Sequence, residues 1–161
     1  MVEATLKVRP VKPADEEILY LWRNQSWIVA LGSSKRIVMR EEHAAWFAET
    51  LTSEKRVLLI VEVDFKPAGM IRYDQLGSAA CEISLYLLPE HIGVGRGTAS
   101  FRASIPELLS WCPVKRIVAR VMRGNQRSLD FFLRLGFLED PLHSTPDTAL
   151  LFLEGFGEPC P

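Results

Sequence analysis

The sequence has no apolar run that approaches the length of a membrane span. Uninterrupted apolar stretches such as Val57–Val61 end far short of the roughly 20 residues that a transmembrane helix needs. The first residues, Met1–Ala4, lack the basic segment and following apolar stretch of a secretory signal peptide. We therefore expect neither membrane association nor export.

Cysteine is scarce, and the cysteines are not arranged for a shared role. Cys81, Cys112 and Cys160 are odd in number, which leaves no complete disulfide framework, and their spacing does not match a metal site. We expect all three to be structural residues in a protein of the reducing cytoplasm. We also expect no metal ion and no covalent acyl-enzyme.

The chain also has almost no net charge. The formal net charge of -1 argues against a nucleic-acid partner. It conceals an uneven distribution, because residues 92–137 hold only two acids, Glu107 and Asp130, among many cations. The basic residues of this segment are Arg96, Arg102, Lys115, Arg116, Arg120, Arg123, Arg127 and Arg134. Such a segment is either a solvated face or, beside a phosphate-binding loop, a dock for a polyanionic ligand.

No repeat, low-complexity tract or Gly/Ser linker divides the chain. Its 161 residues, 48% of them hydrophobic, are enough for one domain with a real core. We expect a single domain over residues 1–161, as a monomer or a homodimer.

Alternating and apolar patterns predict a mixed sheet with helices on both faces, the α/β (α+β) class. The expected strands are Thr5–Arg9, Val57–Val63, Ala68–Tyr73, Ala80–Leu88, Arg116–Met122 and Ala149–Leu153. The expected helices are Pro13–Arg23, Trp27–Leu31 (followed by the polar Gly32, Ser33 and Ser34), Met39–Leu51, Gly97–Leu109 and Ser128–Leu135. In the third helix one stripe is expected to hold His43, Trp46, Phe47, Thr50 and Leu51.

A glycine-rich turn is the most informative segment. Gly93, Gly95 and Gly97 lie between the end of the strand Ala80–Leu88 and the start of a helix. Glycines let backbone amides approach a ligand, and a helix N-terminus adds unsatisfied N–H groups, so the turn can hold a pyrophosphate.

Other glycine motifs fit this turn less well. A dinucleotide fingerprint needs a third glycine at the position of Thr98. A Walker loop needs Gly-Lys-Ser/Thr, which this turn lacks. A turn that merely closes the helix is the structural alternative, and a coenzyme A loop is the interpretation that remains.

Two motifs together resemble the GNAT superfamily of N-acetyltransferases. Ile92-Gly-Val-Gly-Arg-Gly97 is similar to its pyrophosphate loop, Q/R-x-x-G-x-G/A, with Ile92 departing at the first position. Downstream, Asn125 to Phe137 resembles the Asn-x-x-Ala/Ser-x-x-x-Tyr-x-x-x-Gly-Phe block, with Phe132 in place of the tyrosine. The resemblance extends from the first strand to Phe137 and implies a mostly antiparallel sheet with one splayed pair of strands.

A narrower resemblance concerns the acceptor. Trp22-Arg23-Asn24, Glu41-Glu42-His43-x-x-Trp46-Phe47 and Glu82-Ile83-Ser84 look like acetyltransferases of nucleotide-activated amino sugars, such as that of the pseudaminic-acid pathway. Ribosomal-protein N-terminal acetyltransferases share a similar pattern. We take Arg23, Trp46 and Tyr73 as candidates for binding the substrate.

The GNAT resemblance implies which residues bind acetyl-CoA. In the family, the splayed strand offers backbone groups to the pantetheine arm and to the thioester oxygen. By position, these backbone groups belong to Tyr86, Leu87 and Leu88. The loop residues are Ile92, Gly93, Val94, Gly95, Arg96, Gly97 and Thr98. Asn125, Ser128 and Phe132 complete the set, and Asn125 has a compatible alternative role as a helix N-cap.

Three side chains are candidates for catalysis. Glu82 shares the polar face of its strand with Ser84 and Tyr86, and it matches the glutamate of the histone-acetylating branch. Its alternative role is an ion pair at the strand's start. His43 either lines the substrate site or is a buried histidine of its helix. Phe132 cannot protonate a thiolate, so water, Tyr86 or no group at all serves that role.

The sequence therefore predicts an acyl-CoA-dependent N-acyltransferase that moves an acetyl group from acetyl-CoA to a primary amine without a metal. A nucleotide-linked amino sugar is the leading acceptor. A protein α-amine and a small amine are alternatives, as is a non-catalytic acyl-CoA-binding module.

Overall fold

A computed structural model describes residues 4–32 and 34–156. The chain divides into two compact units, which we describe separately. Residues 1–10 and 55–161 form the sheet unit, and residues 11–54 form the helical unit. Ser33, Cys160 and the first residues of the chain lie outside the described residues, so the predictions made for them stay predictions, as does the single domain over residues 1–161.

The sheet unit is built on one seven-stranded sheet. Its strands are β1 (Leu6–Pro10), β2 (Arg56–Val63), β3 (Lys66–Leu76), β4 (Ala80–Leu87), β5 (Arg116–Met122), β6 (Leu138–Glu139) and β7 (Thr148–Glu154). They are ordered β1-β2-β3-β4-β5-β7-β6. Every neighbouring pair is antiparallel except β4 and β5, which are parallel. The predicted class of fold, a mixed and mostly antiparallel sheet, is confirmed.

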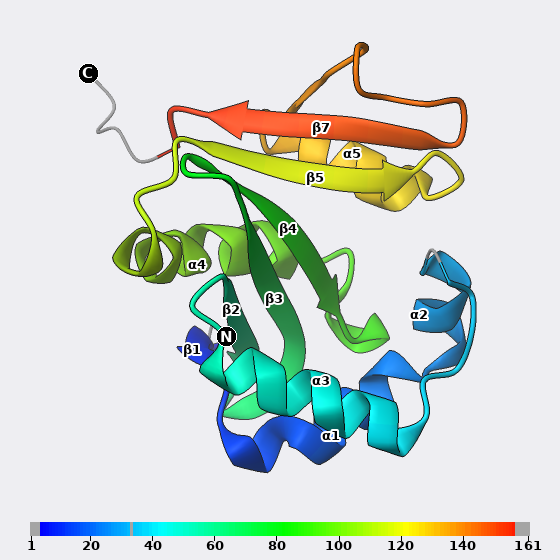
Figure 1. The fold of residues 1–161 in the computed structure, drawn as a ribbon, viewed down its shortest axis with the longest axis vertical. Coiled ribbons are helices and arrows are strands. Elements are labelled where there is room, and N and C mark those ends of the chain that lie inside the picture. Colours follow the sequence, from blue (N-terminus) through cyan, green and yellow to red (C-terminus); the bar gives the residue numbers. More distant parts are fainter. Residues whose placement is uncertain (1–3, 33, 157–161) are drawn as a thin grey trace. The chain divides into compact units, whose positions relative to one another are not determined.

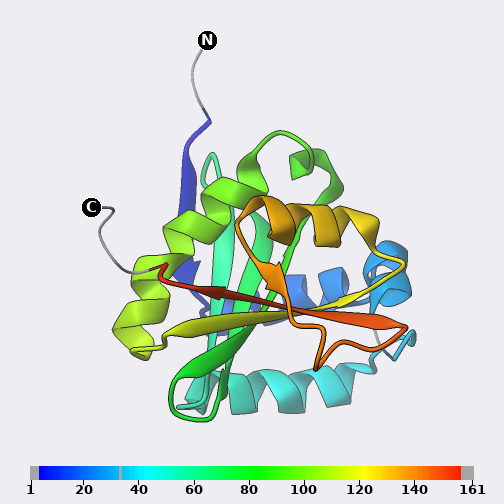
Figure 2. The same ribbon diagram turned by 90° about the horizontal axis from the view of Figure 1, so that it is seen from above.

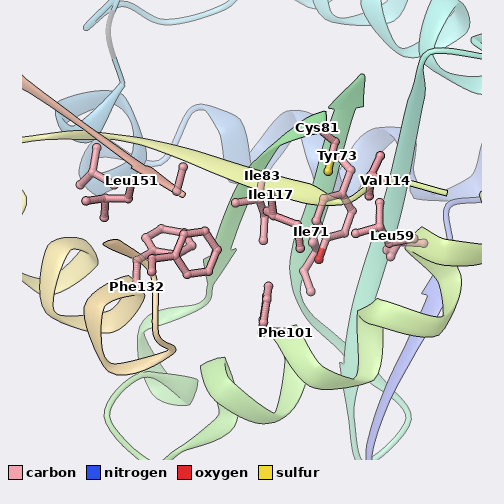
Figure 3. Packing of buried hydrophobic residues seen from close by; sticks show 14 of the residues in the cluster. Leu59, Ile71, Tyr73, Cys81, Ile83, Phe101, Val114, Ile117, Phe132 and Leu151 are labelled. Carbon is pink, nitrogen blue, oxygen red and sulfur yellow. The ribbon is translucent and has the colours of Figure 1, made fainter. Parts of the chain in front are cut away.

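Helices α4 (Arg96–Trp111) and α5 (Gln126–Arg134) belong to the same unit. Figure 2 shows α4 crossing the strands near the start of the sheet, with α5 beyond it toward β5 and β7. Phe101 and Leu108 of α4 and Phe132 of α5 are buried together with apolar side chains of β2, β3, β4, β5 and β7. Figure 3 shows these side chains meeting between the helices and the sheet. One continuous core therefore supports both helices.

The strands β4 and β5 separate along their length. They pair only through Ala80–Arg116, Cys81–Ile117 and Glu82–Val118. Among the described residues no further pair joins them, although β4 continues to Leu87 and β5 to Met122. Figure 1 shows the two arrows moving apart beyond their common start. The sheet thus contains a V-shaped opening between two strands of the same unit, which we call the β4–β5 opening.

The helical unit contains the 3₁₀ turn η1 (Pro13–Asp15) and the helices α1 (Glu16–Arg23), α2 (Ser26–Leu31) and α3 (Arg40–Thr52). The side chain of Asn24 bonds both backbone groups of Val38, at 2.8 and 2.9 Å, and so fixes the segment that leads into α3. Arg40 pairs with Glu17 at 2.6 Å and lies over the ring of Tyr20. These contacts join α3 to α1.

The predicted elements are found, with shifted ends. The segment predicted as one helix from Pro13 begins as a 3₁₀ turn, in which the N–H of Asp15 donates to the carbonyl of Lys12 three residues earlier, at 2.9 Å. The helix α4 continues past Leu109 to Trp111, and β3 continues past Tyr73 to Leu76. The short β6 was not predicted. Leu51, expected on the buried stripe of α3, is 40% exposed.

Candidate functional site

The glycine turn leaves open space where side chains would stand. It follows β4 through the 3₁₀ turn η2 (Pro89–His91) and ends at the N-terminus of α4. Gly93 and Gly95 both have φ of 80°, and a Cβ built on either would meet nothing within 4 Å. The left-handed backbone disfavours other residues at both positions, and the open space lets a ligand approach the amides. Val94 between them is exposed.

Gly97, the third glycine, is required for the packing of two helices. A Cβ on Gly97 would lie 3.0 Å from the ring of Phe131 in α5, and the φ of Gly97 is not positive. Gly97 therefore lets the first turn of α4 pack against α5. We predicted Gly97 as part of the cofactor loop. The contact with Phe131 is by itself a sufficient reason for a glycine at this position.

The first turn of α4 points unsatisfied amides toward the glycine turn. Gly95 is its N-cap residue, and no side chain caps the helix. The N–H groups of Arg96, Gly97 and Thr98 therefore lack partners within the helix, and the positive end of the helix dipole lies beside them. The guanidinium of Arg96 lies 2.6 Å from Nδ1 of His91 and, being a donor only, donates to it. This turn can bind an anion.

The pairing of β3 with β4 fixes where the backbone of β4 points. The N–H of Leu88 donates to the carbonyl of Ala68 at 2.8 Å, one step beyond the register pair Gly69–Leu87. Hydrogen-bonded and non-bonded pairs alternate along an antiparallel ladder. The backbone groups of Tyr86 and Leu88 consequently face β3, and those of Leu85 and Leu87 face the β4–β5 opening.

This register changes the sequence-based assignment. Tyr86, Leu87 and Leu88 were expected to offer backbone groups to pantetheine, but only Leu87 is turned toward the opening. Leu85 shares that orientation and was missed. The two-residue period of the strand was visible in the sequence, but which parity faces β5 depends on the pairing partner, which the pattern of β4 alone does not reveal.

A polar face of the sheet carries Glu82, Ser84 and Tyr86, as their alternation predicted. Glu82 is half-buried, and its carboxylate lies 3.4 Å from Nε of Arg120 on β5. The side chain of Glu82 thus bridges the two strands where they begin to part. The alternative role that we gave Glu82, an ion pair at the start of the strand, is present.

Further charges surround Glu82 on this face. Asp74, its register partner on β3, accepts bonds from Arg56 at 2.5 Å and from Arg72 at 2.7 Å. Arg72 also donates to Ser84 at 3.3 Å. Three guanidinium groups and two carboxylates therefore share this part of the face, which we call the charged face. It carries one net positive charge.

The start of α5 is capped by Asn125. Its side-chain oxygen accepts a bond of 3.2 Å from the backbone N–H of Ser128. The capping role that we gave as an alternative is therefore present, and the amide nitrogen of Asn125 is not needed for it. Phe132, two turns on, is 6% exposed, with its ring 5.0 Å from the rings of Phe131 and Phe137. It is part of the core.

Tyr73 does not serve the role that we predicted. Its side chain is completely buried, and its hydroxyl lies 2.7 Å from that of Ser104 in α4. Burial raises the pKa of the phenol well above its usual value, and the bond to Ser104 only partly opposes this. Tyr73 lies on the core face of β3, opposite the charged face, so it is a core residue and does not bind substrate.

Three predicted residues lie in the helical unit. His43 is 3% exposed and stands among the rings of Tyr20, Trp46 and Phe47, with centroids 5.4, 5.4 and 6.3 Å away. Burial lowers its pKa. The structure thus supports the alternative of a buried histidine. Trp46 is half-buried beside it.

Arg23 at the end of α1 is unusual. Its Nη2 donates to Ser34 at 3.3 Å, whereas its Nη1 is buried without a hydrogen-bond partner among the described residues. A buried guanidinium nitrogen in this state is costly unless a ligand or water completes it.

The described cysteines are not reactive groups. Cys81 is fully buried on the core face of β4, and burial raises the pKa of its thiol to about 12. Cys112, at the end of α4, accepts a weak bond from Gln75. Within residues 4–32 and 34–156 we find no group of three or more potential ligands that could hold a metal ion, and no helix there could span a membrane.

Comparison with known families decides the class of protein. Residues 5–138 match the acetyltransferase (GNAT) domain. The chain belongs to the GNAT acetyltransferase family. The predicted family is therefore confirmed, and the glycine turn and the β4–β5 opening both lie within the matched residues.

Individual relatives are more distant. A Methanocaldococcus jannaschii protein of uncharacterized function is 25% identical over 145 residues, which cover 84% of this chain and only 28% of that protein. The chain thus spans less than a third of the length of this curated relative.

Solved structures share the fold. Spermidine N-acetyltransferase from Vibrio cholerae, in complex with CoA and spermine, has a TM-score of 0.82 at 14% identity, covering 92% of this chain and 95% of that one. Campylobacter jejuni N-acetyltransferase PseH has a TM-score of 0.69 at 18% identity, covering 93% and 98%.

Proposed function

We propose that this GNAT protein transfers an acetyl group from acetyl-CoA to a primary amine. The observation that carries the proposal is the position of the glycine turn at the end of β4. It directly follows the strand whose backbone faces the β4–β5 opening. An anion-binding turn and a row of backbone amides are thereby joined in one continuous surface, which suits a ligand with a pyrophosphate at one end and an amide-rich arm at the other.

Different residues of this surface bind different parts of acetyl-CoA. The amides of Gly93, Gly95 and the first turn of α4 bind the pyrophosphate. The backbone of Leu85 and Leu87 binds the pantetheine arm, and an N–H of this edge polarises the thioester carbonyl. Arg96 and Arg127 add positive charge for the phosphates, and the amide nitrogen of Asn125 is available to the arm.

The reaction is a direct transfer in a ternary complex. The amine nitrogen attacks the thioester carbon, the carbon–sulfur bond breaks, and coenzyme A leaves as a thiolate. Before the attack, Glu82 takes a proton from the substrate ammonium, directly or through a water molecule, so that the neutral amine is the nucleophile. Because Phe132 is buried in the core and has no hydroxyl, water or Tyr86 protonates the thiolate where protonation is needed.

For the acceptor we propose an amino sugar linked to a nucleotide. One observation supports an acceptor that carries negative charge. The charged face has one guanidinium more than it has carboxylates. A polycationic acceptor would be served better by excess carboxylates. The cytoplasm is the expected compartment.

Release of the thiol from acetyl-CoA, measured with a panel of amines, tests the proposal. The panel contains a UDP-linked amino sugar, spermidine and a peptide with a free α-amine. We expect the amino sugar to accelerate thiol release most, and Glu82→Gln to lower that turnover roughly 10²-fold with little change in acetyl-CoA affinity. The deficit should shrink as pH rises, because more of the amine is then neutral.

The other outcomes identify the alternatives. Faster release with spermidine or the peptide would assign the acceptor to a small amine or a protein. Tight acetyl-CoA binding without acceleration by any amine would support a non-catalytic acyl-CoA-binding module. Normal turnover of Glu82→Gln at pH 7 would mean that the base lies elsewhere or that solvent suffices.

A further inference from the structure

Gly69 on β3 lies unusually close to the backbone of β4. A Cβ built on Gly69 would overlap the carbonyl oxygen of Tyr86 and would lie 2.8 Å from the Cα of Leu87. Gly69 is buried, and its φ is not in the left-handed region, so backbone conformation does not explain the glycine. The close approach of two strands does.

The strand β3 is irregular at the same place. Its pairing with β2 shifts register between Val61, which faces Gly69, and Glu62, which faces Pro67. Ala68 is therefore an extra residue of β3, and its carbonyl accepts the bond from Leu88. A bulge of this kind bends a strand and changes the direction of its neighbours. Here the bend brings Gly69 against the last residues of β4.

Those residues of β4 border the β4–β5 opening. Leu87 is the register partner of Gly69, and its own N–H and carbonyl are turned away from β3. Any movement of Gly69 away from Leu87, or of Leu87 away from Gly69, therefore changes the width of the opening at its edge. Tyr86 and Leu88, on either side of Leu87, are held to β3, so the position of β3 at Gly69 sets the position of Leu87.

We propose that Gly69 is a positioning residue that sets the backbone of Leu87 for the thioester end of acetyl-CoA. The inference rests on the proposed function, because it takes the β4 edge as the place of the pantetheine arm. A Cβ at Gly69 meets the backbone of Tyr86 and Leu87 as well as the side chain of Leu87, so a change of side-chain rotamer alone does not relieve the overlap and the two strands must separate at this point. Displacements of about 1 Å at a reacting group cost up to 10²-fold in rate.

Gly69→Ala is the direct test, with Gly77→Ala as its matched control. Gly77 lies in the turn at the opposite end of the β3–β4 hairpin, with φ of 64° and nothing within 4 Å of the position that an added Cβ would occupy. Both substitutions strain the same hairpin, but only the first reaches the β4 edge. Calorimetric titration then measures the dissociation constants of acetyl-CoA and of adenosine 3′,5′-bisphosphate, which lacks the pantetheine arm.

We expect Gly69→Ala to weaken acetyl-CoA at least tenfold while it changes the affinity for the bisphosphate less than twofold. Gly77→Ala should lower the thermal midpoint and leave both affinities within twofold of wild type. Equal acetyl-CoA affinity in wild type and Gly69→Ala would overturn the inference and leave the proposed function intact. Failure of the wild type to bind acetyl-CoA would instead contradict the proposed function.

A measurement on the wild type guards against a variant that does not fold. In protein labelled with glycine carbon-13 at Cα, acetyl-CoA should shift the Gly69 resonance, and the bisphosphate should leave it in place. If the amide of Leu87 responds to acetyl-CoA while Gly69 does not, the two positions are uncoupled and the inference is wrong.

Discussion

The hydroxyl of Tyr73 on β3 lies 2.7 Å from the hydroxyl of Ser104 on α4, inside the core of the sheet unit. Ser104 donates its own proton to the carbonyl of Phe101 at 2.7 Å, so Tyr73 is the donor in the pair. The buried Tyr73 hydroxyl thus donates to Ser104, and the pair connects β3 to the helix that begins at the glycine turn.

Tyr73→Phe should destabilise the protein without affecting the site. The substitution leaves the Ser104 oxygen without its donor in a buried place, which costs about 1 kcal/mol in the free energy of unfolding. Urea denaturation measures that loss, and acetyl-CoA affinity should not change. A Tyr73→Phe protein with weakened ligand binding and normal stability would restore Tyr73 to the site.

Gly95→Val should abolish tight binding of coenzyme A. A branched residue resists the φ of 80° at this position, and its side chain fills the open space beside the amides. Gly77→Val is the matched control, because its φ is also positive but it lies in the β3–β4 turn. Calorimetry with coenzyme A should show a loss for the first variant alone. Equal affinity in Gly95→Val and Gly77→Val would show that the turn does not hold the ligand.

Replacing both Arg96 and Arg127 by Gln should weaken coenzyme A more than dephospho-coenzyme A. This difference arises if either guanidinium meets the 3′-phosphate, and added salt should weaken binding in the same direction. Arg134→Gln, at the end of α5 and exposed like Arg127, is the control. Equal losses for the two ligands would identify both arginines as part of a solvated face.

Sequence reasoning found the glycine turn because its function depends on local backbone properties that glycine alone provides. It found the polar face of β4 for the same reason, since alternation is local. It did not find the orientation of Leu85 and Leu87, the closeness of Gly69 to Leu87, or the packing of Gly97 against Phe131. Each of these depends on a partner from another strand or helix.

Burial misled the sequence analysis in a similar way. Tyr73 and His43 were candidates, yet both are buried, and each has a partner from another element, Ser104 of α4 for Tyr73 and Tyr20 of α1 for His43. Of the eight cations in residues 92–137, Arg116, Arg120 and Arg123 pair with Glu154, Glu82 and Glu139. All three acids lie outside that segment, so the local charge count overstated the basic surface.

Acidification should destabilise the protein through His43. Burial lowers its pKa, and Arg23 and Arg40 add to the effect, while Glu16 and Glu17 oppose it. The unfolded chain therefore takes up this proton at a higher pH than the folded protein does. Stability is fully retained above the ordinary value of about 6.5 and is lost as pH falls below it.

Urea denaturation between pH 7.5 and 5 measures this effect. The wild type should lose more stability over this range than His43→Gln, which has no group to titrate at this position. Parallel losses in the two proteins would mean that His43 is accessible to protons in the folded state, and its place in the aromatic cluster would need revision.

The most direct test of the site is a titration of nitrogen-15-labelled protein with acetyl-CoA, followed through backbone amide resonances. The account predicts large shifts for Gly93, Gly95, Leu85 and Leu87. Smaller shifts are expected for Ser84 and Tyr86, whose amides are bonded to β3. Shifts confined to other parts of the chain, with these four amides unchanged, would contradict the assignment of the glycine turn and the β4–β5 opening as the acetyl-CoA site.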